Sequence, residues 1–584
     1  MKKHSHNTST QKHKSGFAVR SILETDHIFF RIALVIFMAC GGFYAAHTGF
    51  MTMFLCAYLI YLCIKQKGLV FTPNLLDYSV AALVIAYCTG VIAGIDKGMA
   101  LMGASKYFCL LPFMLIMMQI PADEKKNYVR LIPITGVLSV VLCAALLVTP
   151  LREYVFIANR MSGFMGYANT FAFLMLGGIL CEYFYCKKNP LILLILSIGL
   201  FWSGSRTVFV MFILAVIFVG IRHLLIADHY NIKHIIFTII IFIIIVGVSL
   251  IIPATSGIFK RLTDISVNSS TFQGRLLYML DAIPLIKRFP MGLGSYGYSY
   301  AGRLTATGLY NVKYIHNCIL QLMIDTGIIP AVIVILMFSV AWIKNRNYVL
   351  LFLFSHALMD IDFEYVAIFF MFILIAEGRV SVTHDVPIRS TSTEKKQDHP
   401  GIAGLISLAA CCIFATTAAL PSLSNMFFLF DDNVAALNVF AGNTEAREER
   451  MADSYDINEI IDDADHLITH NTYNARGYQM LGTLAYLNGD AEQTVHYLSK
   501  ELTLVPYAGS EYRSFATYLT ELARVARESG DMDTYRFCVD NIRIIQNTMT
   551  EKENNISFFG SRISEQPSFY LDSDATELIN DASE

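Results

Sequence analysis

Charged residues are scarce in this chain. Asp, Glu, Lys and Arg make up 16% of its 584 residues, whereas 55% are hydrophobic, and soluble domains carry about 25% charged residues. Residues 28 to 377 form an almost continuous series of apolar runs. This shortage of charge excludes an ordinary soluble protein and predicts an all-α, polytopic membrane bundle of about 12–13 helices.

Basic residues are few near the end of the chain. From Leu423 onward there are 28 Asp and Glu but only 11 Lys and Arg, although the whole chain has a net charge of only −3. The sequence therefore predicts a basic membrane part followed by a separate acidic domain. Nucleic-acid binding is not expected, because it needs a clustered basic face on a soluble domain.

A cleavable signal peptide and a disulfide framework are also missing. The basic N-terminal residues lead straight into the first apolar run without a small-residue cleavage site. Of the 12 cysteines, only Cys538 lies in the acidic region, so no disulfide can form within that region. The other cysteines are predicted to be small residues of the membrane core.

The apolar runs predict spans near 28–46, 50–64, 77–95, 99–119, 131–149, 168–186, 190–203, 206–226, 234–252, 317–343, 348–359, 363–377 and 402–422. If the N-terminus lies inside, every inside loop carries Lys or Arg, as the positive-inside rule requires. The N-terminus is then expected in the cytoplasm, with the loops 149–167, 203–206, 253–316 and 360–364 on the outer side. Everything after about Pro421 is expected on the same side.

This topology predicts six segments along the chain. They are a basic cytoplasmic N-terminus (1–27), a membrane domain (28–380) with a large outer loop (253–315), a cytoplasmic linker (381–401), a last transmembrane helix (402–422), a helical domain (423–545) and a disordered acidic tail (546–584).

The outer loops contain more arginine than the positive-inside rule favours. The seven residues are Arg152, Arg160, Arg206, Arg261, Arg275, Arg288 and Arg303. A guanidinium offers a planar fork of donors that matches phosphate oxygens, so the cluster suggests a bound pyrophosphate. Several of these arginines could equally face water or lipid headgroups. Arg206 differs, because "SGSRTVFV" places it at the start of a helix at the membrane, where a charge is costly and usually functional.

Other polar residues flank the apolar runs on the same side. In "HALMDIDFEYV", Asp360, Asp362 and Glu364 could bind a metal ion, but pairing with the arginines is favoured. His316 precedes an apolar helix, and its role is open between a structural histidine and a general base. "RMSGFMGYANTFA" combines Arg160 with glycines and Asn169, which predicts a sharp turn into a helix.

Together these motifs resemble the O-antigen ligase / O-antigen polymerase superfamily of bacterial membrane glycosyltransferases, which are GT-C-like. The resemblance rests on "RMSGFMGYANTFA", "SGSRTVFV", "GRLLYMLDAIPLIKRFPMGLGSYGY" and "HNCILQLMIDTGII", with "HALMDIDF" as a weaker match. It covers roughly residues 28 to 380 and does not separate ligases from polymerases.

The resemblance implies transfer of a glycan from undecaprenyl or another polyprenyl pyrophosphate to an acceptor hydroxyl at the outer face, in cell-surface polysaccharide biosynthesis. No nucleotide sugar, metal or other cofactor is implied. Arg206 and Arg275 would hold the pyrophosphate and His316 would act as the general base. Further candidate substrate-binding residues are Arg160, Asn169, Ser205, Asn317, Arg288 and Asp360. The alternatives are a transporter or flippase for an anionic lipid-linked glycan, or a non-catalytic assembly scaffold.

The acidic domain contains a weak repeat signal. In "NARGYQMLGTLAYLNGDAEQTVHYLSKELTLVPY", the residues Tyr478, Leu481, Gly482, Gly489 and Pro506 fall at tetratricopeptide-repeat (TPR) positions. Thr494 and Glu501 replace the alanines that usually occur in this repeat. Two interpretations remain: a generic helical domain, or a platform that docks a protein partner or a glycan chain.

Overall fold

The computed structural model describes residues 27–226, 240, 247, 256–263, 266–344, 347–383 and 402–582. Within these ranges the chain is helical nearly throughout. The two strands among the described residues, β1 (Phe156–Ile157) and β2 (Arg160–Met161), pair antiparallel in a small hairpin. The predicted all-α, polytopic membrane fold is confirmed.

The first half of the membrane domain follows the predicted spans closely. Its elements are α2 (Ile28–Cys40), α3 (Ala45–Gln66), α4 (Leu75–Ala93), α5 (Lys97–Ser105), η1 (Lys106–Cys109), α6 (Leu110–Gln119), α7 (Ala122–Val129), α8 (Leu131–Leu146) and the short α9 (Arg152–Val155). In the described part of the chain, five helical segments are long and apolar enough to cross a membrane, and four of them lie here. The fifth is α21 (Ile402–Leu429).

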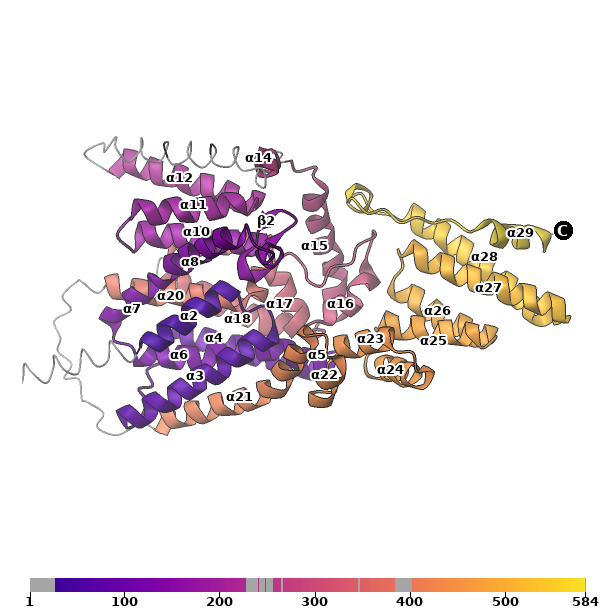
Figure 1. Ribbon diagram of the computed structural model, residues 1–584, viewed down its shortest axis with the longest axis horizontal. Helices are drawn as coiled ribbons and strands as arrows, with labels where there is room; N and C mark the ends of the chain where they lie inside the picture. The colour runs from indigo at the N-terminus through magenta and orange to yellow at the C-terminus, as the bar shows by residue number, and fades with distance from the viewer. Residues whose placement is uncertain are drawn as a thin grey trace, which may run out of the picture.

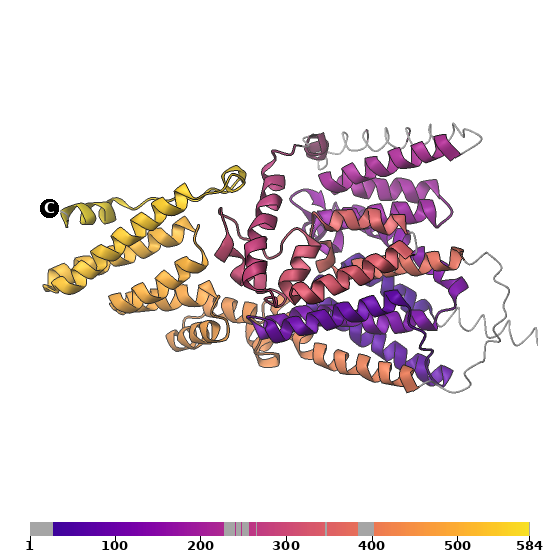
Figure 2. The ribbon, with the colours of Figure 1, turned by 180° about the vertical axis from the view of Figure 1, so that it is seen from behind.

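The second half contains η2 (Gly163–Met165), α10 (Ala168–Phe184), α11 (Pro190–Trp202), α12 (Arg206–Ile226), α14 (Ser256–Thr263), α15 (Ser270–Arg288), α16 (Gly297–Ala301), η4 (Gly302–Thr305), α17 (Cys318–Thr326), α18 (Ile328–Lys344), α19 (Tyr348–Ala357), η5 (Asp362–Glu364) and α20 (Val366–Thr383). The predicted span near 234–252 and most of the predicted linker lie outside the described residues. Helix α15 runs across the ends of the bundled helices, whereas the long apolar helices lie alongside one another (Figures 1 and 2).

The single span predicted at 317–343 is wrong, because the chain breaks there at Gly327. Its backbone has φ 92° and ψ 162°, which separates α17 from α18. A Cβ at this position would lie 2.8 Å from the backbone carbon of Met291, so only glycine permits the contact. The loop after α15 inserts at this break, where the Ile328 amide donates to the Pro290 carbonyl oxygen at 3.0 Å.

The C-terminal region is built from paired helices. Its elements are α22 (Asn433–Val439), α23 (Thr444–Asp453), α24 (Ile457–His470), α25 (Ala475–Leu487), α26 (Ala491–Leu504), α27 (Gly509–Ser529), α28 (Met532–Asn554), η6 (Gly560–Arg562) and α29 (Ser573–Asp581). Side chains of Asn474, Asp490 and Asp531 cap three of these helices. Figure 1 shows these helices projecting from one end of the membrane domain. Their assignment to the tetratricopeptide family stays a prediction.

The predicted disordered tail after Gln546 is a further correction. Helix α28 continues to Asn554, and α29 packs against α27 and α28. The acidic composition of the tail suggested disorder, but Phe569, Leu571 and Ala575 supply enough apolar surface to join the core of these helices.

The C-terminal region docks directly on the membrane domain. Thr444 donates to the Asp96 carboxylate at 2.6 Å, and Lys313 pairs with Glu445 at 2.5 Å. Helix α26 packs on η4 of the large loop, where Leu504 belongs to the same apolar cluster as Leu304. The two parts therefore share an interface.

This interface is expected to weaken as the pH rises. Burial and the nearby Glu511 raise the pKa of Glu501 in α26 from 4.5 to about 8, although Arg303 opposes the shift. The unfolded carboxyl ionises first, so stability present below about pH 4.5 is lost progressively up to pH 8. Glu501→Gln should raise the free energy of unfolding at pH 8 by on the order of 2 kcal/mol and leave it nearly unchanged at pH 4.5.

Thermal unfolding of the full chain at both pH values measures this difference. Glu492→Gln is the matched control, since Glu492 is exposed on the same helix and its substitution should change little. An equal effect of both substitutions would contradict the prediction.

Candidate active site

A cavity of about 630 Å³ lies beside α12, α14 and α15, at the end of the bundle that faces the C-terminal region. Four of the seven predicted outer arginines line it, namely Arg160, Arg206, Arg261 and Arg275, and His316 lines it too. Residues from five separate stretches of sequence thus meet in one place. The size and the positive charge suit an anionic substrate larger than a phosphate ion.

Two tight turns position the first arginines. Ala158 and Asn159 both have positive φ values in the β1–β2 turn, and Arg160 follows directly. Gly204, with φ 60°, turns the chain between α11 and α12 so that Arg206 begins α12. The Arg160 Nε donates to the Ser203 carbonyl oxygen at 2.7 Å, which ties the two turns together.

The Asp360 carboxylate organises the side chains around the cavity. It is fully buried and accepts from Arg275 Nη2 at 2.8 Å, from the Tyr167 hydroxyl at 2.8 Å and from Asn169 Nδ2 at 2.9 Å. His316 Nδ1 lies 3.2 Å from Oδ1, the oxygen that also accepts from Tyr167, whereas Arg275 and Asn169 donate to Oδ2. Asp360 does not itself line the cavity; it holds the residues that do.

A relay of hydrogen bonds extends this arrangement to the next arginine. Asn169 Oδ1 accepts from Arg160 Nη2 at 2.6 Å, while the amide nitrogen of the same side chain bonds Asp360. Arg275 also reaches the Thr207 hydroxyl at 3.4 Å, at the start of α12. The orientations of Arg160, Arg275 and His316 therefore depend on one another.

Electrostatics around the cavity favour an anion. Burial raises the pKa of Asp360, but Arg275 and His316 oppose this so strongly that the pKa falls well below its ordinary value. Burial and the neighbouring Arg261 charge lower the pKa of Arg160 to about 10. Arg160 therefore stays protonated at neutral pH, and Arg275 is paired directly with Asp360. A bound anion would offset the mutual repulsion of Arg160 and Arg261.

The other two carboxylates of "HALMDIDFEYV" also pair with basic groups. Asp362 contacts His356 Nδ1 at 2.5 Å and accepts from the Thr170 hydroxyl, and Glu364 pairs with Lys106 at 3.0 Å. This is the pairing that the sequence favoured over a metal site. Among the described residues, no group of three or more His, Cys, Asp or Glu side chains is arranged to hold a metal ion.

The remaining predicted residues are placed differently. Ser205 is buried at the start of α12, and Asn317 caps α17 and donates to the Leu358 carbonyl oxygen at 2.9 Å. Neither lines the cavity. Arg288 lies exposed at the far end of α15, with its guanidinium 5.6 Å from the Phe289 ring, and the structure does not bring it to the site.

Several lining residues were missed from the sequence. Tyr167 lies two residues before Asn169 in the motif already singled out, so its position was a usable signal. Tyr278 and Tyr310 face each other with ring centroids 4.7 Å apart, and both line the cavity. Ser564 and Glu565 come from the C-terminal region, and no local pattern indicates them.

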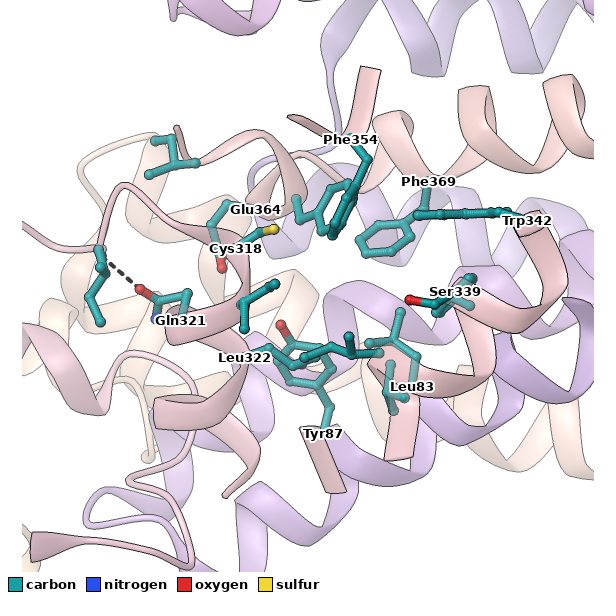
Figure 3. Close-up of a pocket in the computed structure, with 17 residues that line it drawn as sticks. Leu83, Tyr87, Cys318, Gln321, Leu322, Ser339, Trp342, Phe354, Glu364 and Phe369 are labelled. Atoms are coloured by element: carbon teal, nitrogen blue, oxygen red, sulfur yellow. Dashed lines mark hydrogen bonds between the residues drawn. The ribbon is translucent and has the colours of Figure 1, made fainter. Parts of the chain in front are cut away.

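A second, smaller cavity of about 50 Å³ lies between α4, α17, α18 and α20. Figure 3 shows that apolar side chains such as Leu83, Leu322 and Phe369 surround it, with Gln321 and Glu364 at one end. It has room for little more than water, so the larger cavity is the candidate active site.

Part of the chain matches a known protein family. Residues 191–335 match the family model described as O-Antigen ligase. The chain carries an O-antigen ligase domain. The match supports a function of O-antigen ligase or polymerase type in polysaccharide biosynthesis. No curated protein and no solved structure matches the chain.

The O-antigen ligase domain supplies only part of the cavity. The matched residues include Arg206, Arg275 and His316. Arg160, which also lines the cavity, and Asp360, which holds Arg275, lie outside them. The site therefore combines the matched stretch with residues from the β1–β2 turn and from the segment between α19 and α20.

Asp360→Asn should be strongly destabilising. It keeps the shape of the side chain but leaves the buried Arg275 charge without its counter-ion, which costs about 3–5 kcal/mol when a buried pair is broken. Asp574→Asn is the matched control, because it removes an Arg–Asp pair of 3.0 Å whose partners are 58% and 62% exposed. That change should cost less than about 1 kcal/mol.

Thermal or denaturant unfolding of the full chain with each substitution measures the contrast. Similar losses for both variants would show that Asp360 does not organise the site.

Proposed function

We propose that this protein is a glycosyltransferase of the bacterial cytoplasmic membrane that works at the outer face. It transfers a glycan from polyprenyl pyrophosphate to an acceptor hydroxyl. The observation that carries the proposal is the meeting of Arg206, Arg275 and His316 in one cavity beside the ends of the apolar helices.

The cationic side of the cavity suits the leaving group. When the bond between the sugar C1 and the pyrophosphate oxygen breaks, the electron pair leaves with the pyrophosphate. Arg206 and Arg275 would stabilise that charge, and Arg160 and Arg261 would add to the field. Because polyprenyl pyrophosphate is already an activated leaving group, no further energy source is needed.

His316 suits the role of the general base. Its Nδ1 faces Asp360 at 3.2 Å, which leaves Nε2 as the ring nitrogen for an acceptor hydroxyl. The hydroxyl proton would pass to Nε2 as its oxygen forms the new bond to C1. Asp360 would then stabilise the imidazolium, as a carboxylate does beside a catalytic histidine.

Transfer of labelled glycan from polyprenyl pyrophosphate should be lost in His316→Ala and Arg275→Ala. Removal of a general base or of a charge-stabilising donor typically costs about 10²–10³-fold in rate. The assay uses the purified full chain in liposomes and measures both the glycan product and the polyprenyl pyrophosphate released.

Arg288→Ala is the matched control, since Arg288 lies exposed on the same helix as Arg275 but away from the cavity. Its rate should stay within about twofold of wild type. Unchanged transfer in both His316→Ala and Arg275→Ala would refute the mechanism. Movement of the intact lipid-linked glycan across the bilayer, without release of pyrophosphate, would favour a transporter.

A further inference from the structure

The C-terminal region contributes one wall of the cavity. Ile563, Ser564 and Glu565 line it together with residues of the large loop. Ile563 is buried in a small apolar cluster with Leu277 and Tyr310, while Ser564 and Glu565 are exposed. The two polar side chains are thus free to meet a substrate.

This wall is held in place by specific contacts. The Ser557 amide donates to the Thr307 carbonyl oxygen, and the two hydroxyls of these residues lie 2.9 Å apart. A Cβ at Gly308 would be 2.8 Å from the Gly560 Cα, so the two backbones touch. The Asp281 carboxylate of α15 accepts from the Thr307 and Tyr310 hydroxyls. The C-terminal segment is therefore bonded to the loop that leads to His316.

The cavity has two chemically different halves. Arg206, Arg261 and Arg160 come from α12, α14 and the β1–β2 turn, and the fourth arginine, Arg275, comes from α15. The other side is formed by the segments 266–272, 309–312 and 563–565, whose cavity-lining polar residues are Ser266, Ser269, Ser270, Thr271, Tyr310, Asn311, Ser564 and Glu565. Hydroxyl, amide and carboxylate groups beside aromatic rings suit the hydroxyls and the apolar faces of a sugar.

The carboxylate of Glu565 adds a negative charge to this side of the cavity. Burial and the Glu565 charge raise the pKa of Tyr278, whereas Arg275 lowers it, so both charges act on this ring of α15. A negative charge repels pyrophosphate but accepts hydrogen bonds from sugar hydroxyls. The lipid of the donor must approach from the membrane helices, so the half nearest the C-terminal region is left for the second substrate.

We propose that the wall formed by 266–272, 309–312 and 563–565 binds the acceptor as a polyhydroxylated glycan, and that Ser564 and Glu565 determine its specificity. This inference rests on the proposed function. The C-terminal region is then part of the acceptor site rather than an appended domain.

The test separates transfer to the acceptor from transfer to water. The full chain in liposomes receives labelled polyprenyl-pyrophosphate glycan. In one arm of the assay, membranes of the cells that make the protein are added as the source of acceptor, and in the other arm no acceptor is present. Without acceptor, the chain is expected to transfer the glycan to water, and this hydrolysis of the lipid-linked glycan reports on the side of the cavity that carries the arginines. Inhibition of the hydrolysis by inorganic pyrophosphate reports on the same side. The variants are Ser564→Ala/Glu565→Gln and the single Glu565→Gln.

The double variant should lower the ratio of transfer to hydrolysis about 10-fold. The single variant should lower the same ratio by a smaller factor. Hydrolysis and half-maximal inhibition by pyrophosphate should stay within about threefold of wild type. Glu577→Gln is the matched control, because Glu577 is an exposed carboxylate on α29 that does not line the cavity.

Two outcomes would overturn the inference. One is an unchanged ratio of transfer to hydrolysis, including an equal fall in both rates. The other is a rise in both rates, which would make the segment inhibitory. A wild-type chain that consumes no lipid-linked glycan at all would overturn the proposed function itself, and this inference with it.

Discussion

The buried Asp360 carboxylate is the constraint on which the site depends. A buried charge persists only when it is paired and hydrogen-bonded. Asp360 meets this need with donors from the start of α10 and the residue before it, from α15 and from the segment before α17. The positions of these elements are consequently coupled. Each donor is aimed by the carboxylate, so the groups that face the cavity are oriented before any substrate binds.

The same principle recurs at two neighbouring carboxylates. Asp362 with His356 and Glu364 with Lys106 place two more buried pairs along the short segment between α19 and α20. Three successive acidic positions thus connect this segment to α15, α19 and η1. A shift of this segment would leave buried charges unpaired, which costs free energy at each of the three positions. The segment therefore has little freedom to move relative to the helices around it.

Sequence reasoning found the groups that would do the chemistry more readily than those that support them. Arg206, Arg275 and His316 stand out because charge is unusual beside apolar helices, and motif spacing adds a second signal. The apolar runs of the sequence also predicted the positions of most helices of the membrane domain. The break at Gly327 escaped notice, because it depends on the close approach of Met291, which is distant in sequence from Gly327. The ordered tail was missed because its acidic composition indicated disorder, whereas composition gives no information on where Phe569 and Leu571 pack. Glu565 carries no local signal at all, since its place follows from the docking of two distant backbones at Gly308 and Gly560.

The contact between Gly308 and Gly560 has a consequence for biosynthesis. The two glycines are separated by most of the second half of the chain, so ribosomes must complete α21 and the paired helices before the cavity acquires its last wall. Until then the cavity lacks the wall formed by 563–565. A nascent chain therefore carries the arginines of the cavity before it carries Ser564 and Glu565.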